Sequence, residues 1–251
     1  MKTCTIYQPS GLGDIIWLQP IVDHYSKLGY EIHFPVCDFY YENVKNYIQK
    51  DNIIWHKETD DYPLKKYKNI EQNCIFEENE NLFLALIRAD RFVPRSCSVM
   101  IAKYYASGVP ISNWHSNIDI KRNKEREQKV FDVYKIDKKN PYMLINPMFG
   151  TPPNYKIRNS IIENIKTKYQ KIIPNYDIDV NNNINVFDWI GVIENSCETH
   201  TVETAFCYFI DKYSNSNTKL YMYEKRLDNQ TNNFYYLTSL VYRNPNWTFM
   251  E

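Results

Sequence analysis

The sequence predicts an α/β protein made of two domains, each built on a parallel sheet. Short apolar segments alternate with segments of helical spacing, which is the pattern of strand–helix–strand units whose strands run parallel. The alternation is interrupted by the polar stretch Asp137–Pro141 and starts again at Tyr142. We therefore expect an N-terminal domain over residues 1–138 and a C-terminal domain over residues 139–251.

The first half opens with a strand, a glycine-containing loop and a helix. Alternation over Thr3–Gln8 predicts the strand. Apolar residues spaced along one face predict a helix over Asp14–Leu28, which Gly29 ends. Further along this half we expect strands at Tyr30–Val36, Asn52–Trp55, Asn73–Phe76 and Leu82–Ile87, and helices at Phe39–Ile48, Ser96–Ala106 and Lys121–Tyr134.

The second half repeats the opening of the first, with the strand Tyr142–Asn146 followed by a loop and a helix. The polar segment Asp177–Asn185 is expected to be a surface loop, and Asp188 to be the N-cap of a helix over Trp189–Asn195. The other expected elements are helices at Ser160–Tyr169, Thr204–Tyr213 and Asn233–Tyr242, and strands at Lys171–Pro174, Cys197–Val202 and Lys219–Tyr223.

Composition limits the classes of partner. The formal net charge is zero and the two signs are mixed along the chain, so nucleic acid is not an expected partner. The six cysteines are scattered without paired spacing, no targeting segment is visible, and no window approaches the roughly 18 apolar residues of a transmembrane segment. We therefore expect a cytoplasmic protein with reduced thiols. Frequent Ile, Asn, Lys and Tyr suggest an AT-rich genome, as in many viruses.

The loop after the first strand contains Ser10, Gly11, Gly13 and Asp14. Its glycines allow a sharp turn and a close approach to a ligand, so we expect the loop to form one wall of a ligand cleft. It lacks the third glycine and the second-strand acid of the dinucleotide fingerprint. Two interpretations of Asp14 are open: a helix N-cap, or a carboxylate at the mouth of a cleft that acts as general base.

The loop after Asn146 contains Gly150, Lys156 and Arg158 and lies at the carboxyl end of a strand, where open α/β sheets place ligands. The two cations could bind a diphosphate, or could be a solvated pair on a loop.

A third junction, at Glu203, Thr204 and Ala205, leads from a buried strand into a helix that includes Tyr208. The helix start could offer unpaired amides to an anion, and Glu203 could accept hydrogen bonds from ribose hydroxyls. The alternative is a helix whose first turn happens to be acidic. The five histidines lack metal-ligand spacing, so we expect no metal site, and we interpret His200 as structural.

Together these loops resemble the GT-B glycosyltransferases, and within them the heptosyltransferase-like group, glycosyltransferase family 9. Gly13-Asp14 followed by Ile-Ile-Trp-Leu-Gln-Pro is similar to the family's opening, in which the Asp is the proposed base. Asn146-Pro147 with Gly150 and Lys156 is similar to the loop whose lysine contacts donor phosphate. The last family signature is Asp-Thr-Gly, two residues and His; here Glu203, Ala205 and Tyr208 replace its Asp, Gly and His.

The resemblance implies a GT-B-like fold with two facing Rossmann-like domains, and transfer of a sugar from a nucleotide-sugar donor to a glycan acceptor hydroxyl. It implies that Asp14 deprotonates the acceptor, that Lys156 and helix amides stabilise the departing diphosphate, and that neither a metal nor a cofactor is required. Two other interpretations stay open. One is a binding protein of this fold that has lost catalysis, as the altered last signature suggests. The other is a different nucleotide-dependent enzyme, such as a dehydrogenase or epimerase, although the missing third glycine speaks against it.

Overall fold

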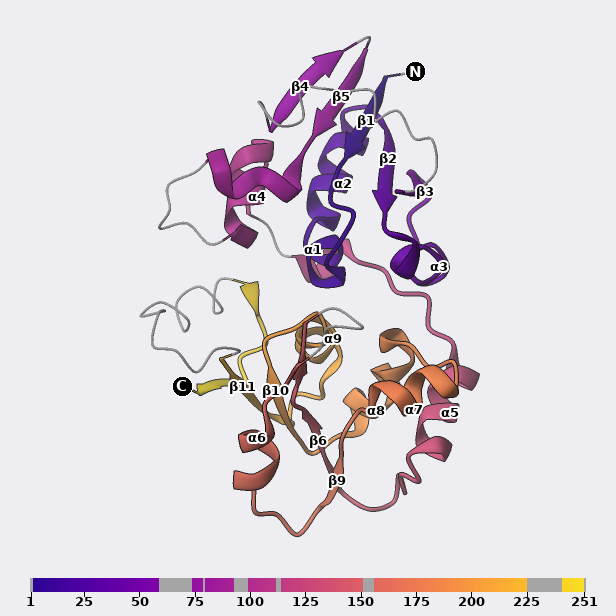
Figure 1. The fold of residues 1–251 in the computed structure, drawn as a ribbon, viewed down its shortest axis with the longest axis vertical. Coiled ribbons are helices and arrows are strands. Elements are labelled where there is room, and N and C mark those ends of the chain that lie inside the picture. The colour runs from indigo at the N-terminus through magenta and orange to yellow at the C-terminus, as the bar shows by residue number, and fades with distance from the viewer. Residues whose placement is uncertain are drawn as a thin grey trace. The chain divides into compact units, whose positions relative to one another are not determined.

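A computed structural model describes residues 2–58, 74–78, 80–92, 99–111, 114–150, 156–224 and 241–250 (Figure 1). The chain divides into two compact units, Met1–Lys121 and Arg122–Glu251. Each unit has its own five-stranded sheet, and within the described ranges no strand joins the two sheets. The predicted α/β class with parallel sheets in two bodies is therefore confirmed.

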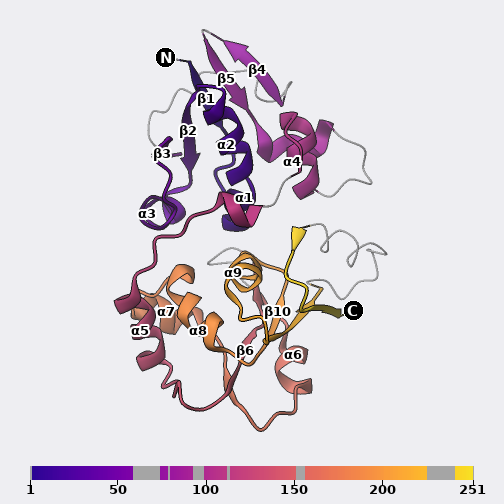
Figure 2. The same ribbon diagram turned by 180° about the vertical axis from the view of Figure 1, so that it is seen from behind.

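The sheet of the first unit has the strand order β3-β2-β1-β5-β4. Figure 2 shows this sheet from behind, with β3 at one edge and the β4–β5 hairpin at the other. The central strand β1 pairs in parallel with both neighbours, and its residue Cys4 lies opposite Ile32 and Leu82. Only β4 runs antiparallel. The strands are β1 (Thr3–Ile6), β2 (Glu31–Val36), β3 (Ile53–Lys57), β4 (Ile75–Glu78) and β5 (Asn81–Leu84).

The predicted single helix over Asp14–Leu28 is wrong, because the structure has two helices that meet at Leu18. Pro20 explains the break: it lacks an N–H and cannot continue the hydrogen-bond ladder of the preceding helix. The side-chain amide of Gln19 partly replaces that ladder by donating to the Ile15 carbonyl at 2.8 Å. The helices of this unit are α1 (Leu12–Trp17), α2 (Gln19–Lys27), α3 (Asp38–Tyr47) and α4 (Val99–Ser107), with 3₁₀ segments η3 (Leu86–Phe92) and η4 (Trp114–Asn117).

The sheet of the second unit has the order β12-β11-β10-β6-β9, and all of its pairings are parallel. One face is covered by an apolar cluster of Met143, Ile145, Ile161 and Val202. A short antiparallel ribbon, β7 with β8, follows strand β6. The strands are β6 (Tyr142–Asn146), β7 (Met148–Phe149), β8 (Lys156–Ile157), β9 (Gln170–Ile172), β10 (Glu198–Val202), β11 (Lys219–Tyr223) and β12 (Trp247–Met250).

Two local predictions in this unit are wrong. The expected loop at 177–185 contains α7, because Asn175 caps it by accepting from the Ile178 amide at 3.1 Å. Asp188 is not an N-cap: Asn185 caps the preceding 3₁₀ segment, and Asp188 completes the capping box by accepting from the Asn185 amide at 2.8 Å. The helices are α5 (Lys124–Val133), α6 (Asn159–Asn164), α7 (Tyr176–Asn181), η5 (Val186–Trp189), α8 (Ile190–Asn195) and α9 (Phe206–Tyr213). The expected helix at Asn233–Tyr242 lies mostly outside the described residues.

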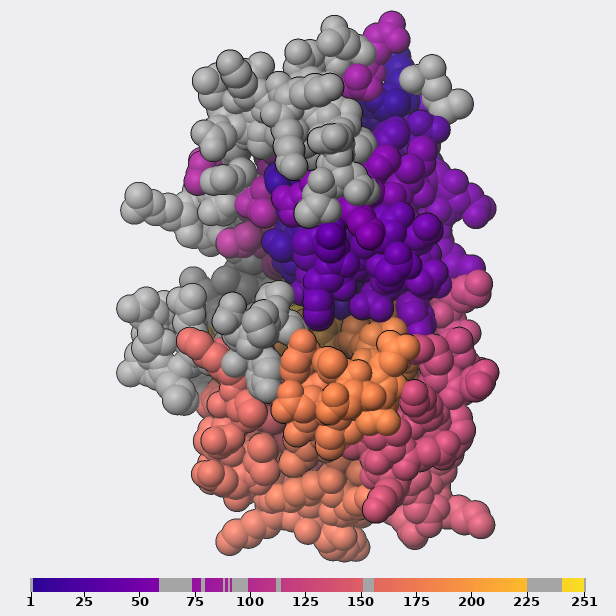
Figure 3. All heavy atoms as spheres, turned by 45° about the vertical axis from the view of Figure 1, so that its right-hand side comes forward, coloured from indigo at the N-terminus to yellow at the C-terminus, as the bar shows by residue number. Residues whose placement is uncertain are grey.

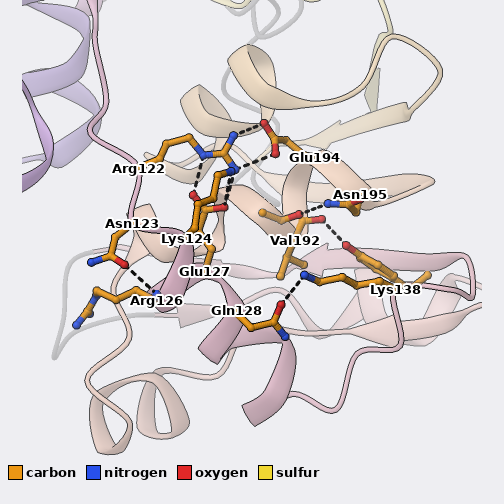
Figure 4. Close-up of polar contacts among 12 residues, drawn as sticks. Arg122, Asn123, Lys124, Arg126, Glu127, Gln128, Lys138, Val192, Glu194 and Asn195 are labelled. Carbon is orange, nitrogen blue, oxygen red and sulfur yellow. Dashed lines mark hydrogen bonds and ion pairs between the residues drawn. The ribbon is translucent and has the colours of Figure 1, made fainter.

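The units divide ahead of the expected position at residues 138 and 139, because α5 packs against α8 of the second unit. Figure 4 shows how Arg122 joins the two helices: its guanidinium contacts the carboxylates of both Glu127 and Glu194. Arg126 adds a second link, donating from Nε to Asp188 at 2.9 Å. Among the described helices none is long and apolar enough to cross a membrane.

Candidate functional site

The loop after β1 places Asp14 in α1, where it is the third helical residue. Gly11 occupies the N-cap position with φ +83°, and no side chain caps this helix. The interpretation of Asp14 as an N-cap is therefore wrong. A Cβ atom on residue 11 would overlap Oδ2 of Asp14, so the carboxylate lies directly over the glycine. About a quarter of the Asp14 side chain, 27%, is exposed.

A buried lysine that the sequence analysis missed holds this carboxylate. Lys103, on α4, is only 2% exposed, and its ammonium pairs with Oδ1 of Asp14. The same ammonium donates to Oε1 of Gln8 at 2.7 Å, and the Gln8 amide donates to the Ser10 carbonyl at 2.6 Å. Burying an ammonium is costly unless it is paired and hydrogen-bonded, so these contacts compensate its charge. The signal in the sequence is a lone cation within the otherwise apolar run Val99–Ala106.

Contacts on either side of Lys103 dock α4 on α1. The indole of Trp17 donates to the Met100 carbonyl at 2.8 Å, and the Tyr104 hydroxyl donates to the Trp17 carbonyl at 2.7 Å. The two rings meet edge-on with centroids 5.0 Å apart. Burial raises the pKa of Tyr104 far above its usual range, so its hydroxyl stays a neutral donor. The ammonium is thus placed at Asp14 by backbone docking as well as by its own bonds.

In the second unit, the predicted residues Asn146 and Thr204 come together. Asn146 ends β6, is buried, and donates from Nδ2 to Oγ1 of Thr201 at 3.1 Å and of Thr204 at 3.3 Å. It therefore joins the ends of β6 and β10. Gly150 follows β7 with φ +99°, and Lys156 is exposed on β8.

The junction into α9 differs from the prediction of unpaired amides. The Phe206 amide donates to Thr204 Oγ1 at 3.3 Å, the Cys207 amide to the Thr204 carbonyl at 3.0 Å, and the Tyr208 amide to the Ala205 carbonyl at 3.2 Å. Glu203 is half-buried, and its amide donates to the Tyr223 carbonyl at 3.2 Å. Tyr208 is buried, with its ring 5.4 Å from that of Tyr242.

Arg158 lies at the start of α6 and is held from three sides. Its amide donates to the Pro147 carbonyl at 3.0 Å, its Nη1 donates to the Glu224 carbonyl, and its guanidinium lies 5.7 Å from the centre of the Tyr223 ring. Its Nε is buried and has no hydrogen-bond partner in the described part of the chain. The guanidinium is therefore fixed in place, and its Nε–H is available to donate to a ligand.

A buried polar chain supports the ring beneath Arg158. His200 contacts the Tyr223 hydroxyl through Nδ1 at 2.9 Å and Glu198 through Nε2 at 2.7 Å, and it stacks on Tyr221. Burial lowers the pKa of His200, so we assign a neutral ring. A carboxylate only accepts, so Nε2 carries the hydrogen and Nδ1 accepts from Tyr223. His200 thus has a structural role, as expected, and it orients the tyrosine.

A surface groove lies away from all of these loops. It has a volume of about 750 Å³ and lies in the first unit between the end of α3 and the start of β3, with Asp119 and Lys121 on its wall. Figure 3 shows this part of the first unit, where α3 and β3 reach the surface. None of the predicted site residues lines it. Within the described residues, no group of three or more His, Cys, Asp or Glu is placed to hold a metal ion, and metal independence stays a prediction.

Comparison with solved structures identifies the fold. No family model matches the sequence, and no curated protein matches it significantly. A glycosyl transferase of family 9 from Veillonella parvula aligns over 100% of this chain and 87% of its own, with a TM-score of 0.55 and 8% identity. The iron-containing dodecameric glycosyltransferase TibC from enterotoxigenic E. coli aligns over 100% of this chain and 62% of its own, with a TM-score of 0.51 and 8% identity.

This chain therefore has a GT-B-like α/β fold, and its structural neighbours are glycosyltransferases. At 8% identity the likeness concerns the fold alone. An origin in a viral or AT-rich genome stays a prediction.

Proposed function

We propose that this protein is a glycosyltransferase that moves a sugar from a nucleotide-sugar donor to an acceptor hydroxyl, with Asp14 as general base. The observation that carries the proposal is that the ammonium of Lys103 fixes the position of the Asp14 carboxylate. This carboxylate follows the first strand of a parallel sheet, at the carboxyl edge where α/β folds bind ligands, and it is oriented by Lys103 while remaining partly exposed. The glycosyltransferase fold of the neighbours supports the reaction class.

In the proposed step, Asp14 takes the proton of the acceptor hydroxyl. The acceptor oxygen forms a new bond to the anomeric carbon, and the bond from that carbon to the diphosphate oxygen breaks. The nucleoside diphosphate leaves with the electron pair. A general base contributes about 10²–10⁴-fold to such a rate. We assign donor binding to the second unit, with Arg158 and Lys156 as cations for the diphosphate and Glu203 for the ribose.

Binding and transfer can be tested separately. The full chain is screened by thermal shift against UDP, GDP, ADP, CDP and their sugars; a ligand at ~100 times its dissociation constant stabilises the fold by about 2.7 kcal/mol. Donors that bind are then mixed with a panel of saccharide acceptors, and release of the nucleoside diphosphate is followed. If no nucleotide shifts the melting temperature, the donor assignment fails.

Asp14→Asn tests the base, because it keeps the size of the side chain and removes its basicity. We expect transfer to fall about 10²–10⁴-fold while donor binding stays near the parent value. The melting temperature should fall, because the buried ammonium of Lys103 loses its charged partner. Asp38→Asn is the matched control, since Asp38 is also an acid in the first turn of a helix that follows a strand of the same sheet. A transfer rate close to the parent rate in Asp14→Asn would remove Asp14 from the mechanism.

A nucleotide- or glycan-binding protein without catalysis is the second candidate. The observation that favours it is the α9 junction, where the first amides are already bonded and Tyr208 is packed in the core. Under this alternative a nucleoside diphosphate binds, but no acceptor promotes its release from the donor, and Asp14→Asn leaves ligand affinity unchanged.

A further inference from the structure

The two oxygens of the Asp14 carboxylate have different surroundings. Oδ1 pairs with the Lys103 ammonium. Oδ2 has no hydrogen-bond partner among the residues that the structure describes, and it occupies the space that a Cβ on residue 11 would fill. Oδ1 already accepts from the ammonium, which makes it the less basic oxygen, whereas neither lone pair of Oδ2 accepts from a described donor.

We infer that Oδ2 is the oxygen that takes the proton, and that Lys103 and Gly11 are positioning residues for it. This inference rests on the proposed function and assigns the geometry of its base. Lys103 holds the carboxylate through Oδ1, and the missing side chain of Gly11 leaves room for Oδ2.

The contacts of Lys103 persist through the step. When Oδ2 takes the acceptor proton, Oδ1 becomes the carbonyl oxygen of a neutral acid and still accepts from the ammonium. Gln8, a neutral acceptor at 2.7 Å, does not change. The Lys103 side chain is 2% exposed, so its ammonium is held by protein atoms and not by bulk water. The carboxyl group keeps its orientation while its charge changes, as an oriented base requires.

Gly11→Ala tests the position of Oδ2, and Gly29→Ala is its matched control. Both glycines have positive φ, +83° and +86°, so both substitutions strain the backbone. A Cβ on residue 29 meets nothing within 4 Å, whereas one on residue 11 takes the place of Oδ2. We expect Gly11→Ala to lower transfer about 10²-fold, the cost of a misplacement of about 1 Å, and Gly29→Ala to keep the parent rate. The melting temperature of Gly11→Ala should fall further than that of Gly29→Ala, because the Asp14 carboxylate must also move.

A double-mutant cycle tests whether Lys103 acts through Asp14. Lys103→Met keeps the apolar stem of the side chain and removes the ammonium. We expect it to lower kcat at least tenfold with an unchanged KM for the donor, and to have no further effect in the Asp14→Asn background. A purely structural lysine would lower the rate by the same factor in both backgrounds. Lys103→Gln serves as the second variant if Lys103→Met does not fold.

The experiments distinguish a failure of this inference from a failure of the proposed function. If Asp14→Asn transfers sugar like the parent, or the parent transfers none, the proposed function fails and this inference fails with it. If Asp14→Asn is inactive but Gly11→Ala matches Gly29→Ala, Oδ2 is not the reacting oxygen. Additive rate losses for Lys103 and Asp14 would overturn the positioning role of the lysine alone.

Discussion

Gly191→Ala is predicted to weaken the packing of α5 on α8. A Cβ at this position would lie 2.8 Å from Oε2 of Glu127 and 3.3 Å from both the Cβ of Glu127 and a ring carbon of Phe131. Glu127 is 5% exposed and cannot simply turn away, because Arg122 donates to its two oxygens at 2.7 and 2.6 Å. Either the helices separate slightly or the ion pair loosens.

The expected cost follows from three opposing contributions. Overpacking costs about 1–3 kcal/mol. Loosening the partly buried pair adds about 1 kcal/mol, discounted because Arg122 is 21% exposed. Replacing a helical glycine by alanine returns up to about 1 kcal/mol. The net prediction is a loss of about 2 kcal/mol in the free energy of unfolding.

Urea unfolding of the parent and Gly191→Ala measures this difference. Glu127→Ala supplies the control background, since it removes Oε2, the nearest of the three atoms that the new Cβ would meet. In that background Gly191→Ala should cost much less, because only the two contacts at 3.3 Å remain. If Gly191→Ala alone is as stable as the parent, Glu127 and Phe131 do not restrict the side chain at position 191. The predicted packing cost would then be refuted.

Three further predictions concern the second unit. Burial raises the pKa of Asp179 from 3.8 to about 6, so the folded state favours its protonated form and loses stability as pH rises from about 4 through about 6. Asp179→Asn should remove up to about 3 kcal/mol of that pH dependence in urea titrations, and an unchanged profile would contradict it. Asp211 is buried and accepts from the Asn244 amide at 2.8 Å and the Trp247 indole at 2.6 Å. Asp211→Ala should cost about 3 kcal/mol and increase hydrogen exchange over 241–250; unchanged exchange there would refute the anchoring role. Arg158→Lys keeps the charge but loses the planar contact with Tyr223, so nucleoside diphosphate affinity by calorimetry should fall about tenfold, and equal affinity would remove Arg158 from the donor site.

Some strands of the second unit were predictable to the residue, whereas β7, β8 and β12 were not expected. Tyr142–Asn146 and Lys219–Tyr223 were expected at the residues where the structure has them, because each is a short run with a marked boundary. Helix ends were less predictable where two candidates compete. Asn185 and Asp188 are both good N-cap residues, and only the packing of Asp188 against Arg126 and the Asn185 amide decides between them. The break at Leu18 follows from Pro20, whose effect the apolar spacing concealed.

The loops of the candidate site could be predicted from the sequence, but the side chains that pack against those loops could not. Glycines and strand ends are local signals, so the loops at Gly11 and Asn146 could be found from the sequence. The contact of Lys103 with Asp14 joins residues far apart in the chain, and no local pattern indicates which element will pack beside the first loop. The polar chain beneath Arg158 likewise depends on the parallel pairing that sets His200 opposite Tyr221.

Stability alone is a weak explanation for the ion pair of Lys103 and Asp14. Removing an ammonium from water costs several kcal/mol, and a buried pair often contributes no more than apolar residues of similar volume. The lysine here is almost fully buried, while its carboxylate partner remains 27% exposed. In the structural pair of Arg126 and Asp188 the carboxylate is the buried partner, at 1% exposed, and the cation is 28% exposed. Burying the cation and leaving the anion accessible instead fixes a carboxylate at the loop after β1 with one oxygen available, which is the arrangement that a general base needs.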